Sequence, residues 1–600
     1  MIKPNRHKFP IKTWKVKLEN HPNKSFRSYI LEGLENGFDI KVKQSPVGCR
    51  FNRPVSSELK TTMLHWVERG LEKGYLIGPF KKNNVPIKNL IYSPFSAIEQ
   101  DNKIRPILNN SAPQNNPTKL SVNDAIEKSD KTVQYIKIKE IVRLLTQVGK
   151  GAYLWTADCK DAYLIVNIRE KDMRYMGFEF MGFTFISSTL MFGLATAPKI
   201  YTDFSDAVEY IINNEKKDIT QLRLLNKIIK LIRHYLDDFF GAHKSLLAAK
   251  QQLAHCLRIM KSLNIPIKTE KIKGPGQRIQ LLGWIFDTNK QIMQIPEEKI
   301  VKVTKQLELY KERFKTRQKV TINQLKSTYG LLRWAFNAIY TGESLLLSLH
   351  KLIYQKNLPE HHYVRLSSDF IKDCDLISSI IKSIKNGISF KHILNNKPSQ
   401  ADIYVDASLA GLGGYTQSGK WFYYNFSNKL HTLITKRVRG APDIQTLELA
   451  AIVVAVDIWK DYLRGKYISI YTDNEPVEHN VRRWNIRAHR TDKLYLLKIL
   501  SCLLITYDIK MTINGIRSKL NKGADLLSRY EPNLENIKKF KEFAASRNIV
   551  LEQQPTQSKK KFITYLQEIQ RLRASKPCDY LISRQKEFFI FRKIINKKDK

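Results

Sequence analysis

The sequence His234-Tyr235-Leu236-Asp237-Asp238-Phe239-Phe240 places two adjacent carboxylates inside an apolar and aromatic run. Two anions this close repel each other in a low-dielectric setting, and divalent cations bound to them relieve the repulsion. A β-hairpin tip that holds Mg²⁺ meets this need, because Mg²⁺ prefers one or two carboxylates together with phosphates and waters. The motif predicts a metal-binding hairpin, with an exposed acidic turn as the alternative.

A third carboxylate, Asp158, ends the apolar run AYLWTA and precedes the β-rich run YLIVNI. Aspartates at the ends of separate strands can converge on two metal ions about 3.5–4 Å apart, which clamp the attacking and leaving oxygens. Phosphoryl transfer is the predicted chemistry. Asp161 could instead be an ordinary acid on the protein surface, and Asp203 is expected to be such a surface acid.

Outward from these motifs, short β-rich runs alternate with helical segments over residues 90–290, and residues 296–390 are almost wholly helical. Two helix starts are predicted: Ser56 or Ser57 caps an amphipathic helix that Gly74 terminates, and Thr321 with Gln324 forms a capping box. A second α/β unit begins at Ala401. The pattern indicates a multidomain α+β chain.

Composition indicates a polyanionic partner, because 101 Lys and Arg against 56 Asp and Glu give a net charge of +45. A basic surface kept for solubility is the alternative. Six scattered cysteines without a CxxC pair predict a reducing compartment, cytoplasmic and/or nuclear, and no structural zinc. The longest apolar stretch, Leu447 to Trp459, is interrupted by two acids, so we expect no secretion and no membrane contact.

The second α/β unit has four acids of its own. They lie in IYVDAS, TLELAA, IYTDNE and NKGADLLSR, and they are Asp406, Glu448, Asp473 and Asp525. Two end predicted strands and two sit on predicted helices, an arrangement that can present four carboxylates to two Mg²⁺ ions. The alternative for Glu448 is that it faces solvent. However, its helix is so apolar that we expect the helix to be buried. A buried acid needs a partner.

The segments TADCKDAYLIVNI, LMFGLATAPKIYTDF, HYLDDFF, IKTEK and LLGWIF stand in the order of the palm motifs of reverse transcriptases. Together with HPNKSFRSYILEGLENGFDI and TINQLKSTYGLLRWAF, they resemble the polymerase polyprotein of DIRS-type, tyrosine-recombinase retrotransposons over about residues 20–530. The four acids of the second unit resemble those of ribonuclease H in set and order. The region before Asp525 lacks the His that some ribonucleases H use, so a modest cleavage rate is expected.

The resemblance implies a right-hand polymerase of fingers, palm and thumb, with a helical connector and a C-terminal α/β ribonuclease H-like domain. The expected boundaries are 1–90 for an N-terminal extension and the start of the fingers, 91–290 for fingers and palm, 291–395 for thumb and connection, 396–532 for the ribonuclease H-like domain, and 533–600 for a basic tail of unknown role.

The resemblance also implies roles for single residues. It assigns metal binding and catalysis to Asp158, Asp237 and Asp238 in the polymerase and to Asp406, Glu448, Asp473 and Asp525 in the nuclease. It places the main chain of Asp161 and Ala162 under the incoming triphosphate and makes Tyr163 a steric gate against the ribose 2′-hydroxyl. Arg105 resembles the fingers arginine that grips the triphosphate.

Three further positions are implied near the nucleotide. Phe192 is an apolar platform, Gly193 removes a side chain where backbone approaches nucleotide or template, and Lys271 lies near the leaving pyrophosphate. The sequence departs from the commonest pattern at Asn109, where many relatives carry Asp, and at Cys159, where an aliphatic residue is usual.

The implied function is RNA-directed DNA synthesis with ribonuclease H activity. The expected cofactors are two Mg²⁺ ions per active site, with Mn²⁺ as the alternative, and the expected partners are an RNA template, a DNA primer, RNA/DNA hybrid and deoxynucleoside triphosphates. A catalytically inactive or domesticated nucleic-acid-binding protein is the alternative; a DNA-directed polymerase or a nuclease alone is disfavoured because both acid sets occur in one chain. No protease, integrase zinc or recombinase motif is visible, so a separate recombinase or integrase protein is expected.

Overall fold

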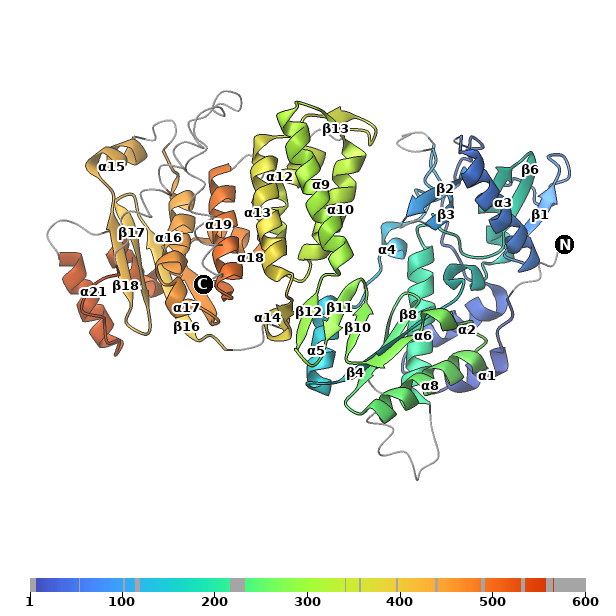
Figure 1. Ribbon diagram of the computed structural model, residues 1–600, viewed down its shortest axis with the longest axis horizontal. Coiled ribbons are helices and arrows are strands. Elements are labelled where there is room, and N and C mark those ends of the chain that lie inside the picture. The colour runs from blue at the N-terminus through green and yellow to red at the C-terminus, as the bar shows by residue number, and fades with distance from the viewer. Residues whose placement is uncertain are drawn as a thin grey trace. The chain divides into compact units, whose positions relative to one another are not determined.

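The computed structural model describes residues 7–52, 54–100, 103–113, 119–215, 232–339, 341–354, 358–394, 398–436, 441–486, 491–529, 535–556 and 565. The chain divides into two compact units, Met1–Leu281 with Phe286–Lys290, and Leu282–Ile285 with Gln291–Lys600. Both mix helices and sheets (Figure 1), which confirms the multidomain α+β class. Among the described residues, no helix is long and apolar enough to cross a membrane.

The first unit contains the motifs around Asp158 and Asp237. Its helices are α1 (Ile11–Lys17), α2 (Lys24–Asn36), α3 (Ser57–Glu72), α4 (Lys128–Lys131), α5 (Ile138–Val148), α6 (Ala197–Asn214) and α8 (Leu246–Ser262), with short 3₁₀ turns η1 (Ala162–Ile165), η2 (Glu170–Tyr175) and η3 (Thr269–Lys271). Its strands are β1 (Leu76–Phe80), β2 (Phe95–Gln100), β3 (Lys103–Leu108), β4 (Tyr153–Asp158), β5 (Gly177–Phe180), β6 (Phe183–Ser187), β7 (Arg233–Tyr235), β8 (Asp238–His243), β9 (Lys273–Gly276) and β10 (Arg278–Leu281).

A four-stranded antiparallel sheet in the order β7-β8-β4-β9 forms the centre of this unit. Strand β4 is buried along almost its whole length, and Trp155 at its middle is fully buried and donates to Gln252 of α8 at 2.8 Å. A second sheet has the order β1-β6-β5, and β2 pairs with β3 as a hairpin. The predicted helix start is confirmed, because the Ser56 hydroxyl accepts from Leu59 N at the beginning of α3.

The second unit begins with a helical segment. Its elements are β12 (Ile292–Gln294), α9 (Glu297–Lys315), β13 (Val320–Thr321), α10 (Ile322–Phe336), α11 (Gly342–Leu345), α12 (Leu347–Tyr354), β14 (Tyr363–Val364), α13 (Ser368–Ile384), β15 (Ile388–Ser389) and α14 (Phe390–Leu394), while β11 (Trp284–Asp287) spans the boundary of the two units in sequence. Thr321 and Gln324 cap α10 reciprocally, as predicted.

A five-stranded sheet follows in the order β18-β17-β16-β19-β20. Its elements are β16 (Ala401–Ala407), β17 (Gly411–Thr416), β18 (Trp421–Asn425), α15 (Asn428–Thr435), α16 (Ile444–Ile458), α17 (Lys460–Leu463), β19 (Tyr467–Thr472), α18 (Glu475–Arg483), α19 (Thr491–Thr506), β20 (Lys510–Gly515), η4 (Ser518–Leu520), α20 (Lys522–Ser528) and α21 (Glu535–Ser546). Strands β18, β17 and β16 pair antiparallel, and β16, β19 and β20 pair parallel.

The two faces of this sheet bury different side chains. Ile403 and Val405 of β16 share one apolar core with α16 and α19, whereas Tyr415 of β17 joins a second core with α20 and α21. Within residues 533–600, expected from the sequence to form a basic tail of unknown role, α21 packs on this sheet. The tail segments FITYLQEIQRLR and FFIFRKII lie outside the described residues except for Tyr565.

Candidate active sites

The hairpin of β7 and β8 presents Asp237 and Asp238 at its tip. Tyr235 pairs with Asp238, and Leu236 turns the chain with a φ of 53°. Asp158, the last residue of β4, pairs with Asp238 on the neighbouring strand, while Cys159 N donates to Asp237 O at 3.0 Å. The sheet register therefore brings three carboxylates from two distant segments to one edge of the four-stranded sheet.

The electrostatics of this edge suit a bound cation. Burial, followed by the charges of Asp238 and Asp158, raises the pKa of Asp237 to about 7. Burial and Asp158 also raise the pKa of Asp238. A cluster that holds protons this strongly is one that a divalent cation would neutralise, so these residues fit Mg²⁺.

Two lysines provide positive charge at the same edge. Lys268 Nζ lies 3.3 Å from Asp158 Oδ1, and Lys271 Nζ also pairs with Asp158. The hydrogen bond to Asp158 raises the pKa of Lys271 and burial lowers it. The hydrogen bond is the larger effect, so the pKa of Lys271 is raised. Lys268 and Lys271, both in the segment IKTEK, thus place two cations beside the carboxylates; the sequence analysis singled out only Lys271.

Tyr163 lies near these acids, close enough for the charge of Asp237 to act on it. Its ring packs on Phe192 with centroids 5.1 Å apart and edge-on to Tyr201 at 5.4 Å. Burial raises its pKa, with smaller contributions from Tyr135 and Asp237. Phe192 keeps 37% of its surface exposed. The two rings together therefore form a rigid aromatic wall with one open face.

Asp161 and Ala162 form the turn from β4 into η1. Asp161 adopts a left-handed conformation, with a φ of 57°, and its carboxylate binds Arg69 Nη2 of α3 at 2.6 Å. Tyr75 OH donates to the same carboxylate at 3.2 Å. The Asp161 side chain is thus occupied by this ion pair, and it is not a free surface acid.

Gly193 is required for a packing reason that the sequence did not reveal. Its φ is 109°, and a Cβ there would lie 1.9 Å from the carbonyl oxygen of Leu108 on β3. Leu108 N donates to Phe192 O at 3.0 Å, and Asn123 Nδ2 donates to Gly193 O at 2.8 Å. The close approach is thus to the protein's own strand β3.

Arg105 lies on that same strand, opposite Ile98, with an exposed side chain. At the departures from the family pattern, Asn109 accepts from Ser111 N at 3.3 Å, and Cys159 is fully buried beside Tyr201. Asp203 is not the surface acid that the sequence predicts. It is largely buried on α6 and pairs with Lys199 one turn earlier, because its helix faces the core.

Glu209 of α6 contacts β7 just before the hairpin that carries Asp237 and Asp238. Its carboxylate accepts from His234 N at 3.1 Å and contacts His234 Nδ1 at 2.8 Å, and Arg233 Nη1 lies 3.3 Å away. The sequence motifs did not predict this contact, because Glu209 and His234 are 25 residues apart in the chain.

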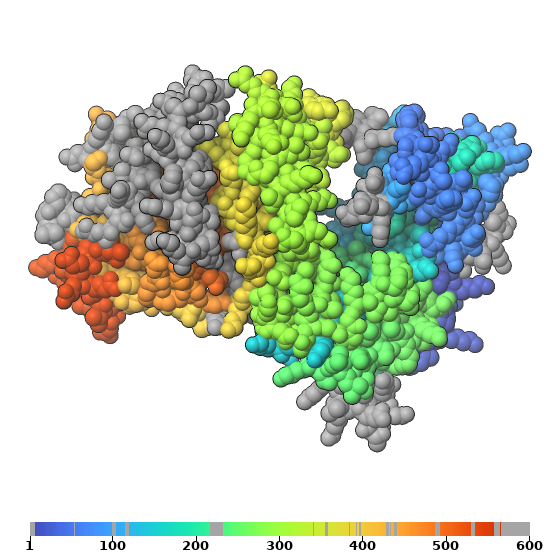
Figure 2. Space-filling view, in the orientation of Figure 1, coloured from blue at the N-terminus to red at the C-terminus, as the bar shows by residue number. Residues whose placement is uncertain are grey.

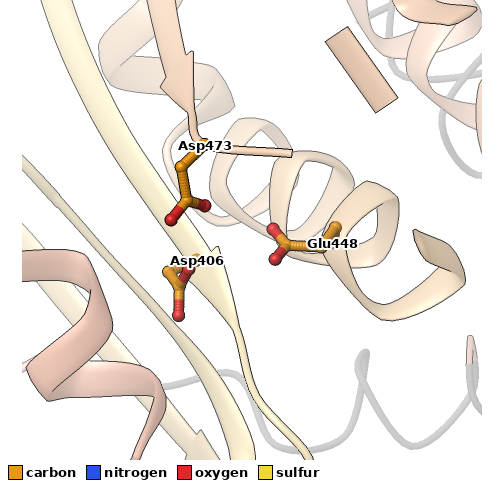
Figure 3. A group of neighbouring side chains, drawn as sticks. All are labelled: Asp406, Glu448 and Asp473. Atoms are coloured by element: carbon orange, nitrogen blue, oxygen red, sulfur yellow. The ribbon is translucent and has the colours of Figure 1, made fainter. Parts of the chain in front are cut away.

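Three of the four carboxylates predicted for the nuclease converge in the second unit (Figure 3). Asp406 lies near the end of β16, Asp473 follows β19, and Glu448 projects from α16. Because β16 and β19 are parallel neighbours, their ends lie at the same edge of the sheet. One carboxylate oxygen from each of the three residues lies within 4.8 Å of the others, which is close enough for shared metal ions.

Glu448 is the most perturbed of these acids. Burial, then the charges of Asp406 and Asp473, raise its pKa to about 9, and similar causes raise the pKa of Asp406 to about 7. Glu448 Oε2 is buried without a hydrogen-bond partner among the described residues. A buried carboxylate oxygen without a donor is costly, so this orphaned atom fits the role of a cation ligand.

Asp525 lies apart from that trio. It is on α20, keeps 37% of its side chain exposed, and binds Arg529 Nε at 2.6 Å. One turn later, the Ser528 hydroxyl donates to Asp406 Oδ2. Ser528 is a contact that the sequence motifs did not reveal, although its spacing of three residues from Asp525 places both on one helical face. Asn474 uses its side-chain oxygen to cap α18.

Comparison with known proteins agrees with these two sites. A family model described as reverse transcriptase (RNA-dependent DNA polymerase) matches residues 99–286, and one described as an RNase H-like domain found in reverse transcriptase matches residues 397–497. No curated protein matches the chain.

Solved structures of the foamy virus protease-reverse transcriptase are similar at 15% identity. The structure in complex with RNA/DNA hybrid has a TM-score of 0.43 and covers 92% of this chain and 65% of that one. The structure in complex with dsDNA has a TM-score of 0.40 and covers 85% and 98%.

The family matches define the class: the chain is an RNA-directed DNA polymerase that carries a ribonuclease H-like domain. The two domains, in this order, indicate a retroelement reverse transcriptase and ribonuclease H polyprotein.

Proposed function

We propose that the chain copies RNA into DNA at Asp158, Asp237 and Asp238, and cuts the RNA strand of RNA/DNA hybrid at Asp406, Glu448, Asp473 and Asp525. The observation that supports this most is the convergence of Asp158 with Asp237 and Asp238, and of Asp406 with Glu448 and Asp473, with raised carboxyl pKa values in both groups. Both reactions would be phosphoryl transfers.

Each acid set would hold two Mg²⁺ ions, with Mn²⁺ as the substitute. Bound there, the ions would activate the attacking oxygen and stabilise the leaving one. In the polymerase, Asp158, Asp237 and Asp238 would hold them. Lys271 would exchange its ion pair with Asp158 for contact with the departing pyrophosphate, because a bound cation would take its place on the carboxylate.

The other polymerase residues would bind and select the nucleotide. Arg105, exposed on β3, would grip the triphosphate, and the main chain of Asp161 and Ala162 would lie beneath it. The wall of Tyr163 and Phe192 would leave no space for a 2′-hydroxyl. The ion pair of Asp161 with Arg69 would fix the turn that carries this backbone.

The net charge of +45 supports nucleic acids as partners, since lysine and arginine contacts release counterions from phosphates. We propose an RNA template, a DNA primer, RNA/DNA hybrid and deoxynucleoside triphosphates, with a separate recombinase or integrase for DNA insertion. The resemblance over residues 20–530 supports a DIRS-type element. The five described cysteines are free, which supports the cytoplasm or nucleus.

Two matched variants test the assignment in one preparation. Asp237→Asn should abolish primer extension on an RNA template with Mg²⁺ and leave hybrid cleavage intact, and Asp406→Asn should do the reverse. Each loss should exceed about 100-fold, since changes to residues that only orient metal ligands cost up to that factor. Extension by Asp237→Asn, or hybrid cleavage by Asp406→Asn, at the unsubstituted rate would remove the respective site.

A further inference from the structure

The chain beyond the nuclease acids folds back over the nuclease sheet. Phe540 of α21 is fully buried and shares a core with Trp421 and with Ala524 and Leu527 of α20. Figure 1 shows α21 beside the sheet, and Figure 2 shows its atoms as part of the outer surface. This segment lies outside both family matches.

The residues after α21 contact the start of the edge strand β18 and the turn before it. Glu552 N donates to Gly419 O at 2.9 Å, and Thr556 N donates to Trp421 O at 2.8 Å. Trp421 Nε1 returns a bond to Glu552 O at 3.0 Å. Farther along, Tyr565 OH donates to Asp457 Oδ2 of α16 at 2.8 Å. We call residues 535–556 together with Tyr565 the C-terminal strap.

Helix α20 lies between the sheet on one side and α21 of the strap on the other. A Cβ on Gly413 of β17 would lie 2.4 Å from Leu527 Cβ, and a Cβ on Gly523 would lie 2.5 Å from Phe543 Cε1. Helix α20 therefore fits between two surfaces without spare room. It has seven residues, and helices shorter than about 12 residues are marginal without tertiary packing.

Helix α20 also carries two side chains of the proposed nuclease site. Asp525 is the fourth predicted nuclease carboxylate, and the Ser528 hydroxyl donates to Asp406 Oδ2. This bond is the largest of the effects that lower the pKa of Asp406 against its burial. Whatever holds α20 in place therefore also sets the positions of these two groups relative to Asp406.

We propose that the C-terminal strap is part of the nuclease machinery: Phe540 and Phe543 are positioning residues that press α20 onto the sheet, and so hold Ser528 against Asp406 and fix the place of Asp525. This proposal rests on the proposed nuclease function. It predicts that residues outside the family matches control how tightly the nuclease site binds Mg²⁺.

The test uses the full chain with Phe540→Ala. The control is Phe422→Ala, which removes an equally buried phenylalanine from the opposite face of the same sheet. Phe540→Ala should speed amide hydrogen exchange over residues 522–528, because loss of packing opens α20 locally. It should also raise the Mg²⁺ concentration for half-maximal hybrid cleavage roughly 10-fold, the scale seen when residues that orient metal ligands are changed. Primer extension should be unchanged.

Phe422→Ala should lower the melting temperature and leave exchange over 522–528 and the Mg²⁺ midpoint as they were. Ser528→Ala should shift the midpoint without changing exchange. Unchanged exchange in Phe540→Ala, or an equal increase in Phe422→Ala, would overturn the proposal. If Phe540→Ala does not fold, Phe543→Ala gives the same readouts. A chain that never cuts hybrid would refute the nuclease function alone, because exchange does not depend on cleavage.

Discussion

At the residue scale, the buried carboxyl groups of Glu448 and Asp406 should make the stability of the protein depend on pH and Mg²⁺. Glu448 and Asp406 have pKa values raised to about 9 and about 7, above the ordinary values near 4. The folded state then binds more protons than the unfolded state, so the free energy of unfolding of metal-free protein falls as pH rises from about 4 to 9.

Calorimetry of the protein in EDTA and in Mg²⁺ checks this. Mg²⁺ should raise the melting temperature of the second unit more at pH 8 than at pH 6, because the ionised acids repel one another only when no cation is bound. Glu448→Gln should flatten the pH dependence in EDTA. A Glu360→Gln control, which changes an exposed acid paired with Lys326 in the helical segment of the same unit, should keep the full slope; equal slopes in both variants would show that Glu448 is not the source of the pH dependence.

Tyr163 leads to a second prediction at this scale. Tyr163→Ala should raise the ratio of ribonucleotide to deoxynucleotide incorporation by at least about 10-fold, since removing the ring opens space for a 2′-hydroxyl. Tyr163→Phe keeps the ring against Phe192 and should stay near the unsubstituted ratio. Single-nucleotide extension with matched GTP and dGTP measures it, and an unchanged ratio in Tyr163→Ala would reject the gate.

At the scale of elements, Gly193 couples the aromatic wall to strand β3. Gly193→Ala should weaken nucleotide binding, because its Cβ would displace Leu108 and with it the strand that carries Arg105. We expect KM for the deoxynucleotide to rise about 10-fold or more, with a smaller effect on kcat.

Gly182→Ala is the control for this variant. Gly182 also has a positive φ, 81°, but a Cβ there meets nothing within 4 Å. It introduces backbone strain without the clash. If both variants raise KM equally in steady-state extension assays, strain alone explains the effect and the contact with β3 is irrelevant.

Local patterns predicted the elements well where they depend on neighbouring residues. The Ser56 cap and the Thr321 capping box formed as expected, because each needs only a few consecutive residues. The convergence of Asp158 with Asp238 followed from strand ends in motifs of known order. The site residues remain predictions as catalysts, although the structure brings most of them together.

Contacts between distant segments could not be predicted from the sequence. The pairing of Asp161 with Arg69, the anchoring of His234 by Glu209 and the close approach of Gly193 to Leu108 all depend on the tertiary fold. The position of α21 on the nuclease sheet is of the same kind. The sequence of α21 is rich in lysine, and its apolar face, which includes the buried Phe540, could be identified only from the structure.

At the scale of the whole molecule, the two acid sets belong to different compact units, so each site has its own sheet and core. In both, parallel or antiparallel register brings strand ends together and burial raises carboxyl pKa values. The same physical requirement, cations among crowded carboxylates, thus arises twice in one chain.

The most direct test is anomalous diffraction from crystals of the full chain grown with Mn²⁺, an RNA template and a DNA primer, and a non-hydrolysable deoxynucleotide. We predict Mn²⁺ peaks bound by Asp158, Asp237 and Asp238 together, with Lys271 released from Asp158. Ordered density for these three side chains without a peak between them, and with Lys271 still paired to Asp158, would contradict the assignment of the polymerase site.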